Sequence, residues 1–267
     1  MQGLGRVSKG NFNSPILTPT NPYYPLLTLE RVNTCVKMGI IQEKQIYFFE
    51  EFLDFGVVAG FTDKAYSGLK VEEDVKRISS SLDFTYQKLS YLNQVHGSTV
   101  ILPEAETQVF TGDGLLSDKN KEILLVRTAD CLPLFFYEST KKVIGIIHLG
   151  WRPAKENIIA VFIDKLKDVF GAGLKEAFLG IGPGLRRSCF EVGREFLDFS
   201  CFAGFIEERD SKYYLDMVSF LKRSFVARGF KKENFLDSQI CSFCDSNFYS
   251  ARRDKTDKRT LSFIMQR

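Results

Sequence analysis

The run ILLVRTADCLPLFFYESTKKVIGIIHLGW, residues 123–151, decides the fold class. It contains three short apolar segments, residues 123–126, 132–137 and 143–147, which are rich in β-branched and aromatic side chains. Such segments are typical of strands that are buried on both faces, because a strand with one solvated face would alternate apolar and polar residues. The run therefore predicts a layered β-sheet core.

Helical patterns flank these strands. Val71, Val75, Ile78 and Leu82 recur at spacings of four, three and four, which places them on one face of an amphipathic helix. A second helix is predicted over residues 153–170, because its apolar residues follow helical spacing and proline is tolerated in a first helical turn. The remaining predicted elements are a helix over residues 217–228, a short helix over 191–199, and strands over 48–61, 177–181 and 260–265.

The composition fits one globular domain. The chain has 267 residues, of which 44% are hydrophobic and 26% charged, so it can bury a sizeable core. The formal net charge is only +3, and the basic residues are interleaved with acidic ones, so a nucleic-acid partner is not implied. Four of the eight prolines lie in residues 1–30, which predicts an extended arm before a domain over residues 31–267.

Two features bear on location. No segment approaches the roughly 20 apolar residues that a membrane span requires, and the N-terminus lacks the apolar core of a signal peptide. We therefore expect a cytoplasmic protein with no membrane partner. In that reducing compartment the six cysteines are expected to remain thiols, which makes metal binding and nucleophilic chemistry their interesting roles.

The chain has only two histidines, and both lie where an apolar run meets a glycine. His96 precedes Gly97, and His148 comes two residues before Gly150. Between them Cys131 lies at the junction of a polar break and the next predicted strand. Strand ends at one edge of a sheet converge in space, so these three side chains are predicted to meet.

Two imidazoles and one thiolate form a ligand set that favours zinc. Three protein ligands leave a coordination position for water or substrate, which is the arrangement of catalytic zinc sites. Taken singly, a histidine near a strand end is more often a hydrogen-bonded core residue, and a cysteine a small buried apolar one. Taken together, His96, Cys131 and His148 indicate either a metal centre or a Cys/His site.

Charged residues flank these positions. Asp130 is a candidate general base, a residue that orients a ligand, or a turn cap. Arg152 is a candidate anion ligand through its planar fork, or half of a surface ion pair. Asp113 lies between two glycines and is interpreted as a turn residue, ranked below the other two.

Two further motifs are weaker. Cys241 and Cys244 form a C-x-x-C pair, but a second pair and a thioredoxin-like context are missing, so we interpret the pair as structural or incidental. The glycine-rich run at residues 180–184 lacks the helix start of a dinucleotide fingerprint. We interpret it as a loop whose backbone approaches the site.

Seven motifs in order resemble the family called multicopper polyphenol oxidoreductase or laccase-domain proteins, which also includes the peptidoglycan editing factor. The resemblance covers residues 55–267. The motifs are Asn93-Gln94-Val95-His96-Gly97, Gly112-Asp113-Gly114, Thr128-Ala129-Asp130-Cys131-Leu132-Pro133, His148-Leu149-Gly150-Trp151-Arg152, Gly180-Ile181-Gly182-Pro183, Cys189-Phe190-Glu191-Val192 and Tyr249-Ser250-Ala251-Arg252-Arg253-Asp254.

The resemblance implies an α/β fold, a single domain with a layered mixed β-sheet core flanked by helices. It also implies a zinc ion at His96, Cys131 and His148, and purine nucleoside phosphorylase activity on adenosine, inosine, guanosine or methylthioadenosine with phosphate. Some members of the family deaminate adenosine. Copper oxidation is discounted, because enzymes of that type cluster several coppers on many histidines and this chain has two.

The sequence departs from the family pattern around the substrate. Lys64 stands where the family usually has an arginine, which keeps the charge but loses bidentate phosphate recognition. Gly184 replaces a cysteine, Ala251 a tyrosine, and Asp257-Lys258-Arg259 a Thr-Gly-Arg close.

Three hypotheses follow from the residues and the resemblance together. In the first, the chain is a zinc-dependent purine nucleoside phosphorylase in which Arg152, Lys64 and Arg253 hold phosphate and Asp130 manages protons. In the second, Cys131 is a nucleophile for amide hydrolysis, activated by one of the two histidines. In the third, the chain binds purine nucleosides without turnover.

Overall fold

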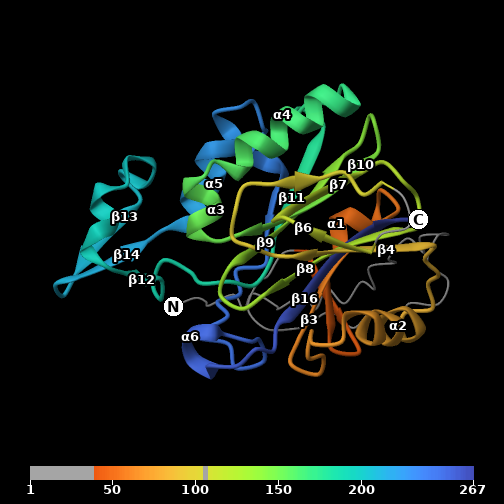
Figure 1. Cartoon of the computed structure of the whole chain (residues 1–267), viewed down its shortest axis with the longest axis horizontal. Helices are drawn as coiled ribbons and strands as arrows, with labels where there is room; N and C mark the ends of the chain where they lie inside the picture. The colour runs from red at the N-terminus through yellow and green to blue at the C-terminus, as the bar shows by residue number, and fades with distance from the viewer. Residues whose placement is uncertain (1–38, 105–107) are drawn as a thin grey trace, which may run out of the picture.

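Two large β-sheets pack face to face in a computed structural model of the chain, which describes residues 39–104 and 108–267 (Figure 1). The predicted arm over residues 1–30 and Cys35 lie outside the described residues. The first sheet has the order β1 (Ile40–Glu43), β2 (Ile46–Phe49), β3 (Val57–Thr62), β16 (Thr260–Gln266), β8 (Glu122–Thr128), β4 (Lys88–Asn93), β6 (Val109–Thr111). The second has the order β15 (Phe235–Asp237), β11 (Ala177–Ile181), β9 (Leu132–Glu138), β10 (Val143–Leu149), β7 (Gly114–Ser117), β5 (Val100–Ile101).

Both sheets are mixed. The neighbours β9 and β10 run antiparallel, as do β8 and β16. By contrast β4 pairs parallel with β8, and β11 pairs parallel with β15. The layered mixed sheet core expected from the resemblance is therefore present.

Side-chain alternation along β9 and β10 explains why their sequences are apolar throughout. Phe135 and Ile146 point into the core between the two sheets, while their chain neighbours Phe136 and Ile147 belong to the core on the outer face. Because successive side chains of a strand point to opposite faces, both faces of these strands are buried. The prediction of doubly buried strands is confirmed.

Helices cover the two outer faces. On the first sheet α2 (Val71–Ser81) buries Val71, Val75 and Ile78 against a cluster that includes Leu125. On the second sheet α4 (Ile158–Phe170) packs with α5 (Met217–Val226), so the molecule has helical layers on both sides (Figure 1). The remaining helices are α1 (Glu50–Leu53), α3 (Trp151–Lys155) and α6 (Ala251–Asp254), with 3-10 turns at Arg194–Asp198, Ser200–Phe202 and Lys232–Asn234.

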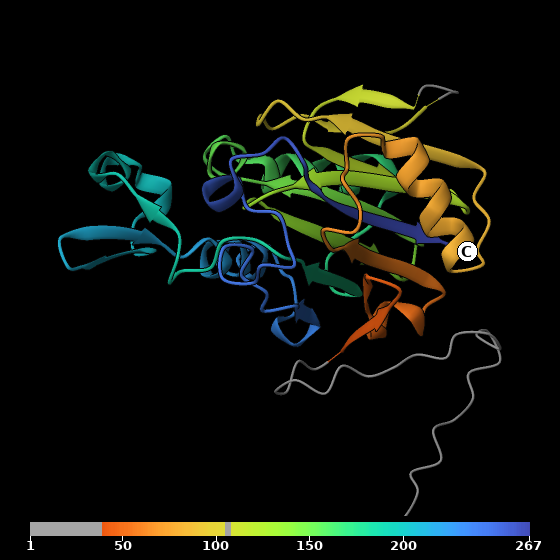
Figure 2. The ribbon, with the colours of Figure 1, turned by 90° about the horizontal axis from the view of Figure 1, so that it is seen from below.

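A small third sheet projects from this body at the left of Figures 1 and 2. It has the order β12 (Glu191–Val192), β14 (Lys212–Leu215), β13 (Ile206–Arg209). The two views agree that its outer end stands clear of the two main sheets.

Three predicted elements are only partly confirmed. The strand over residues 48–61 is interrupted by α1 and by Gly56, whose positive φ of 72° helps β2 turn back to pair antiparallel with β3. The helix over residues 153–170 is divided into α3 and α4, because Asn157 adopts a left-handed conformation with φ 64°. Residues 191–199 begin as strand β12, paired with β14, and continue as a 3-10 turn.

Among the described residues, no helix is long and apolar enough to cross a membrane.

Candidate metal centre

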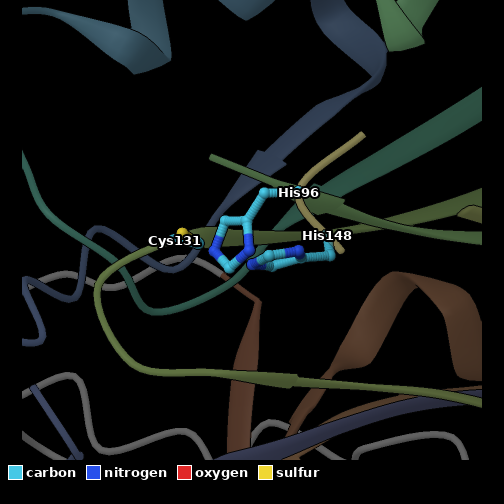
Figure 3. Close-up of side chains that lie close together, drawn as sticks. All are labelled: His96, Cys131 and His148. Carbon is cyan, nitrogen blue, oxygen red and sulfur yellow. The ribbon is translucent and has the colours of Figure 1, made fainter. Parts of the chain in front are cut away.

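His96, Cys131 and His148 meet where the two sheets come together. His96 follows β4 of the first sheet, Cys131 directly precedes β9 of the second, and His148 lies near the end of β10. One ligand atom from each side chain lies within 4.8 Å of the others. Figure 3 shows the two imidazole rings beside each other with the Cys131 sulfur next to them. The predicted convergence is therefore observed, although the ligands come from both sheets and not from one edge.

The three side chains differ in exposure, and this gives the site an open side. The His148 side chain is 3% exposed, Cys131 is half-buried and His96 is exposed. A ligand would therefore approach past His96, while His148 forms the closed end.

Asp113, which the sequence interpretation ranked as a turn residue, anchors both histidines. Its Oδ1 atom lies 2.8 Å from His148 Nδ1 and accepts from the backbone N–H of His96 at 3.1 Å. Its Oδ2 atom accepts from the backbone N–H groups of Gly97 at 2.6 Å and Val95 at 3.3 Å. Three consecutive N–H groups thus converge on one carboxylate, which holds His96 in its left-handed conformation of φ 59°.

This carboxylate decides how His148 can bind. Because Nδ1 donates to Asp113, Nε2 is left as the ring's donor atom for an ion. Burial alone would raise the pKa of Asp113, but the hydrogen bonds from His148 and Gly97 hold it below its ordinary value. The side chain is 0% exposed, so an ionised Asp113 depends on these donors.

Charge also organises the Cys131–His148 pair. Burial would raise the pKa of the Cys131 thiol, but the charges and hydrogen bonds of His148 and His96 lower it to about 6. Burial would lower the pKa of His148, but Cys131 and Asp113 raise it to about 9. Near neutral pH the metal-free site therefore carries a thiolate beside an imidazolium.

Gly150 leaves room for the Cys131 sulfur. A Cβ atom at Gly150 would lie 2.9 Å from Cys131 Sγ and 3.7 Å from His96 Cδ2. The backbone of Gly150 is extended with φ −96°, so the glycine is explained by this close approach and not by its φ. The glycine-rich loop behaves similarly, as predicted: the N–H of Leu185 donates to the Asp130 carbonyl at 2.8 Å, and a Cβ at Gly184 would lie 2.6 Å from Leu132 Cδ2.

The flanking candidates Asp130 and Arg152 differ in whether their polar groups already have hydrogen-bond partners. Both carboxylate oxygens of Asp130 accept hydrogen bonds, Oδ1 from Ser242 Oγ at 2.8 Å and Oδ2 from the Arg252 N–H at 2.8 Å. Arg152 is exposed and lies over the Trp151 ring at 4.4 Å, and no carboxylate among the described residues pairs with it. Arg152 thus has free donors four residues after His148 in the chain, whereas Asp130 joins the site to the C-terminal loops.

Lys64 and Arg253 meet at Asp254. Lys64 Nζ lies 2.9 Å from Asp254 Oδ2, and Arg253 pairs with both oxygens of that carboxylate at 2.8 Å. The Arg253 guanidinium also donates to the carbonyls of Ser242 and Phe248. Phosphate binding by either residue stays a prediction, and it would require these bonds to be exchanged.

The donor set can be tested against the metals. Two imidazoles and one thiolate suit zinc, and the hydrogen bond from His148 to a buried carboxylate is the usual support of a zinc-bound histidine. A cluster of coppers does not fit, because the whole chain supplies two histidines.

The comparison with protein families agrees with this site. A family model described as "Multi-copper polyphenol oxidoreductase laccase" matches residues 61–267, which hold all three candidate ligands. The chain belongs to this family. Within the laccase-domain family, it is 33% identical over 213 residues to a purine nucleoside phosphorylase of Campylobacter jejuni, covering 78% of this chain and 91% of that protein. A purine nucleoside phosphorylase of Borreliella burgdorferi is 32% identical over 70% of this chain and 91% of that protein.

Two solved structures share the fold. YlmD from Geobacillus stearothermophilus superposes with a TM-score of 0.77 at 23% identity, covering 86% of this chain and 99% of that one. YfiH from Bacillus licheniformis gives a TM-score of 0.75 at 22% identity.

Proposed function

We propose that the chain is a zinc-dependent purine nucleoside phosphorylase, with the catalytic domain over residues 31–267. The proposed reaction splits adenosine, inosine, guanosine or methylthioadenosine with phosphate, and deamination of adenosine is a second proposed activity. The observation that carries the proposal is the convergence of His96, Cys131 and His148 in a chain whose relatives are named for this activity. The cytoplasmic location expected from the sequence is part of the same proposal.

Each residue has a role that its contacts allow. His96, Cys131 and His148 would hold the ion, which would supply Lewis-acid activation of a substrate oxygen. Asp113 positions His148 through its Nδ1 atom. The free guanidinium of Arg152 is our first candidate for holding phosphate in a bidentate manner, with Lys64 and Arg253 as further candidates. Asp130 is the candidate for proton transfer, in addition to its bonds to Ser242 and Arg252.

The test is purine release from inosine, measured with and without phosphate. We expect release that depends on phosphate, is lost on chelation, returns with added zinc, and is absent from Cys131→Ala. Equal rates in the wild type and in Cys131→Ala would contradict the proposal.

A second candidate is amide hydrolysis by a Cys131 nucleophile. The observation that favours it is the lowered thiol pKa of about 6 beside an imidazolium, which is the electrostatic state of catalytic cysteines. Activity that survives complete chelation but ends on thiol alkylation would select this candidate. Binding of purine nucleosides without turnover would select a binding module, for which the pairing of Lys64 with Asp254 is the supporting observation.

A further inference from the structure

Three cysteines outside the site described above come together at the loop whose Ser242 hydroxyl donates to Asp130. Cys189 lies just before β12, and Cys241 and Cys244 lie in a turn after β15. Their sulfur atoms all lie within 4.8 Å of one another, and the Cys189 and Cys244 sulfurs are 3.1 Å apart. The C-x-x-C pair has no second such pair in the sequence, but the fold brings one further cysteine, Cys189, to it.

We propose that Cys189, Cys241 and Cys244 bind a second metal ion, a zinc ion that is independent of the His96–Cys131–His148 site.

The turn that carries Cys241 and Cys244 is fixed by backbone hydrogen bonds. The Gly184 N–H donates to the Ile240 carbonyl at 3.3 Å, which ties the start of this turn to the glycine-rich loop. The turn is closed by the Asp245 N–H, which donates to the Cys241 carbonyl at 2.9 Å. Both cysteines are therefore held on one fixed turn, and a thiolate is the form of cysteine that ligates metals.

Two neighbouring arginines of α6 hold the two cysteine loops in place. Arg252 donates to the carbonyls of Cys189 at 3.0 Å and Glu191 at 2.8 Å. Arg253 donates to the carbonyl of Ser242 at 2.7 Å and to that of Phe243 at 2.8 Å. The three sulfurs are therefore brought together by ordinary hydrogen bonds, so the ligand set is preorganised for an ion.

The local charge suits an anionic ligand set. Three thiolates with one zinc ion carry a net charge of −1, which needs a nearby cation. Arg186 supplies one: its side chain is 14% exposed, and its charge interacts with that of Cys241. Its guanidinium is fixed by Asp237 at 3.0 Å and by the Ile240 carbonyl at 3.0 Å.

The fourth coordination position would face solvent. Cys244 is exposed, and it lines an open pocket together with Gln239, Cys241, Asp245 and Ser246. Water is therefore the expected fourth ligand. Soft thiolates prefer zinc to the hard cations magnesium and calcium, which take oxygen ligands.

A disulfide between Cys189 and Cys244 is the competing outcome. It would use two of the three thiols and leave Cys241 unused, although the Cys241 sulfur also lies within 4.8 Å of the other two. A metal ion uses all three, and for that reason the geometry favours it.

The ion would stabilise the loops that contact the His96–Cys131–His148 site. It would clamp the Cys189 loop to the Cys241–Cys244 turn, whose Ser242 hydroxyl donates to Asp130 at 2.8 Å. The same turn pairs with the glycine-rich loop, since the Ser242 N–H donates to the Gly184 carbonyl at 3.2 Å. Losing this ion would loosen the loops beside Cys131 without removing a ligand of the first site.

Zinc content per chain tests the proposal with the full-length protein, purified under reducing conditions without chelator. We expect about two zinc ions in the wild type, one in Cys189→Ser, one in Cys244→Ser, one in Cys131→Ala and none in the double variant Cys131→Ala/Cys244→Ser. Cys201→Ser is the matched control, because Cys201 is a free thiol outside both clusters, and it should retain two. Wild-type zinc content in both Cys189→Ser and Cys244→Ser would overturn the proposal.

Cobalt titration of the metal-free wild type needs no variant and remains decisive if a variant fails to fold. The near-ultraviolet band from thiolate to cobalt grows with the number of thiolate ligands. We expect the three-cysteine site to contribute about three times the band of the single-thiolate site. A total band that matches one thiolate, or a mass that shows a Cys189–Cys244 disulfide in the reduced preparation, would refute the second site. Because these readouts do not measure activity, they stand apart from any failure of the phosphorylase proposal.

Discussion

Replacing Asp113 with asparagine is the sharpest test of how the candidate metal centre is built. The side chain keeps its size, but one carboxylate oxygen becomes an NH2 group and the negative charge is lost. The carboxylate accepts from four donors: His148 Nδ1 and the backbone N–H groups of Val95, His96 and Gly97. An asparagine oxygen has two lone pairs, so at least two of these donors lose their acceptor.

The size of the effect follows from that count. A fully buried donor left without a partner costs about 1–3 kcal/mol, and the three backbone donors are only part-buried, so we expect Asp113→Asn to lower the free energy of unfolding by about 2–3 kcal/mol. His148 also loses the partner that fixes its Nδ1 proton, and loss of such a partner typically weakens zinc binding by about 10- to 100-fold. Both changes would be measured on one preparation, by chemical denaturation and by competition with a zinc chelator.

The acid side of the stability curve should change as well. The folded pKa of Asp113 lies below its unfolded value, so its stabilising contribution is present above about pH 3.9 and is lost as the pH falls through the folded pKa. Asp113→Asn cannot titrate, and the variant should therefore show a weaker loss of stability on acidification than the wild type.

Glu122→Gln is the matched control for burial. Glu122 is another buried carboxylate, which accepts from Ser90 Oγ at 2.6 Å and Ser117 Oγ at 2.5 Å, away from the candidate ligands. The Glu122→Gln variant should have a lower free energy of unfolding than the wild type but the same zinc affinity. If Asp113→Asn bound zinc as tightly as Glu122→Gln, the argument that Asp113 positions His148 would be refuted.

Three further changes probe the same centre. In the metal-free protein, the rate of Cys131 alkylation, followed by peptide mapping, should be half-maximal near pH 6, because His148 lowers the thiol pKa to about 6. A midpoint near the ordinary thiol pKa of about 8.5 would count against the thiolate–imidazolium pair. Gly150→Ala should displace the Cys131 sulfur, since the new Cβ would lie 2.9 Å from it. The substitution should weaken zinc binding about tenfold or more and change the free energy of unfolding little, and a wild-type zinc affinity in competition with a chelator would disprove this. Arg152→Lys keeps the charge but loses the planar fork, so it should raise the KM for phosphate about tenfold, which corresponds to the loss of roughly one charged hydrogen bond. The KM for the nucleoside should not change, and a rise in the nucleoside KM alone would show that Arg152 contacts the nucleoside and not phosphate.

Much of the fold could be predicted from the sequence because its central strands have an unambiguous pattern. The apolar segments of residues 132–137 and 143–147 correspond to β9 and β10, which are buried on both faces. The errors arose where one backbone conformation overrides a periodic pattern. Asn157 with φ 64° divides a continuous helical pattern, and nothing in the apolar spacing signals it.

The candidate ligands could be predicted because the chain has so few histidines, but their support could not. Asp113 lies between two glycines, which is typical of a turn, and its four donors come from residues 16 to 35 positions away along the chain. Cys189 likewise lies 55 residues from Cys244, so the C-x-x-C pair gave no sign of its third partner. The sequence also gave no sign of the partners of Arg253, which pairs with Asp254 and donates to backbone carbonyls; its predicted role in holding phosphate stays a prediction.

X-ray absorption at the zinc edge, measured on the Cys244→Ser chain, tests the first coordination shell most directly. For zinc held by His96, Cys131 and His148, the spectrum should show one sulfur at about 2.3 Å and two imidazole nitrogens at about 2.0–2.1 Å. A shell with no sulfur, or with no imidazole nitrogen, would contradict the account.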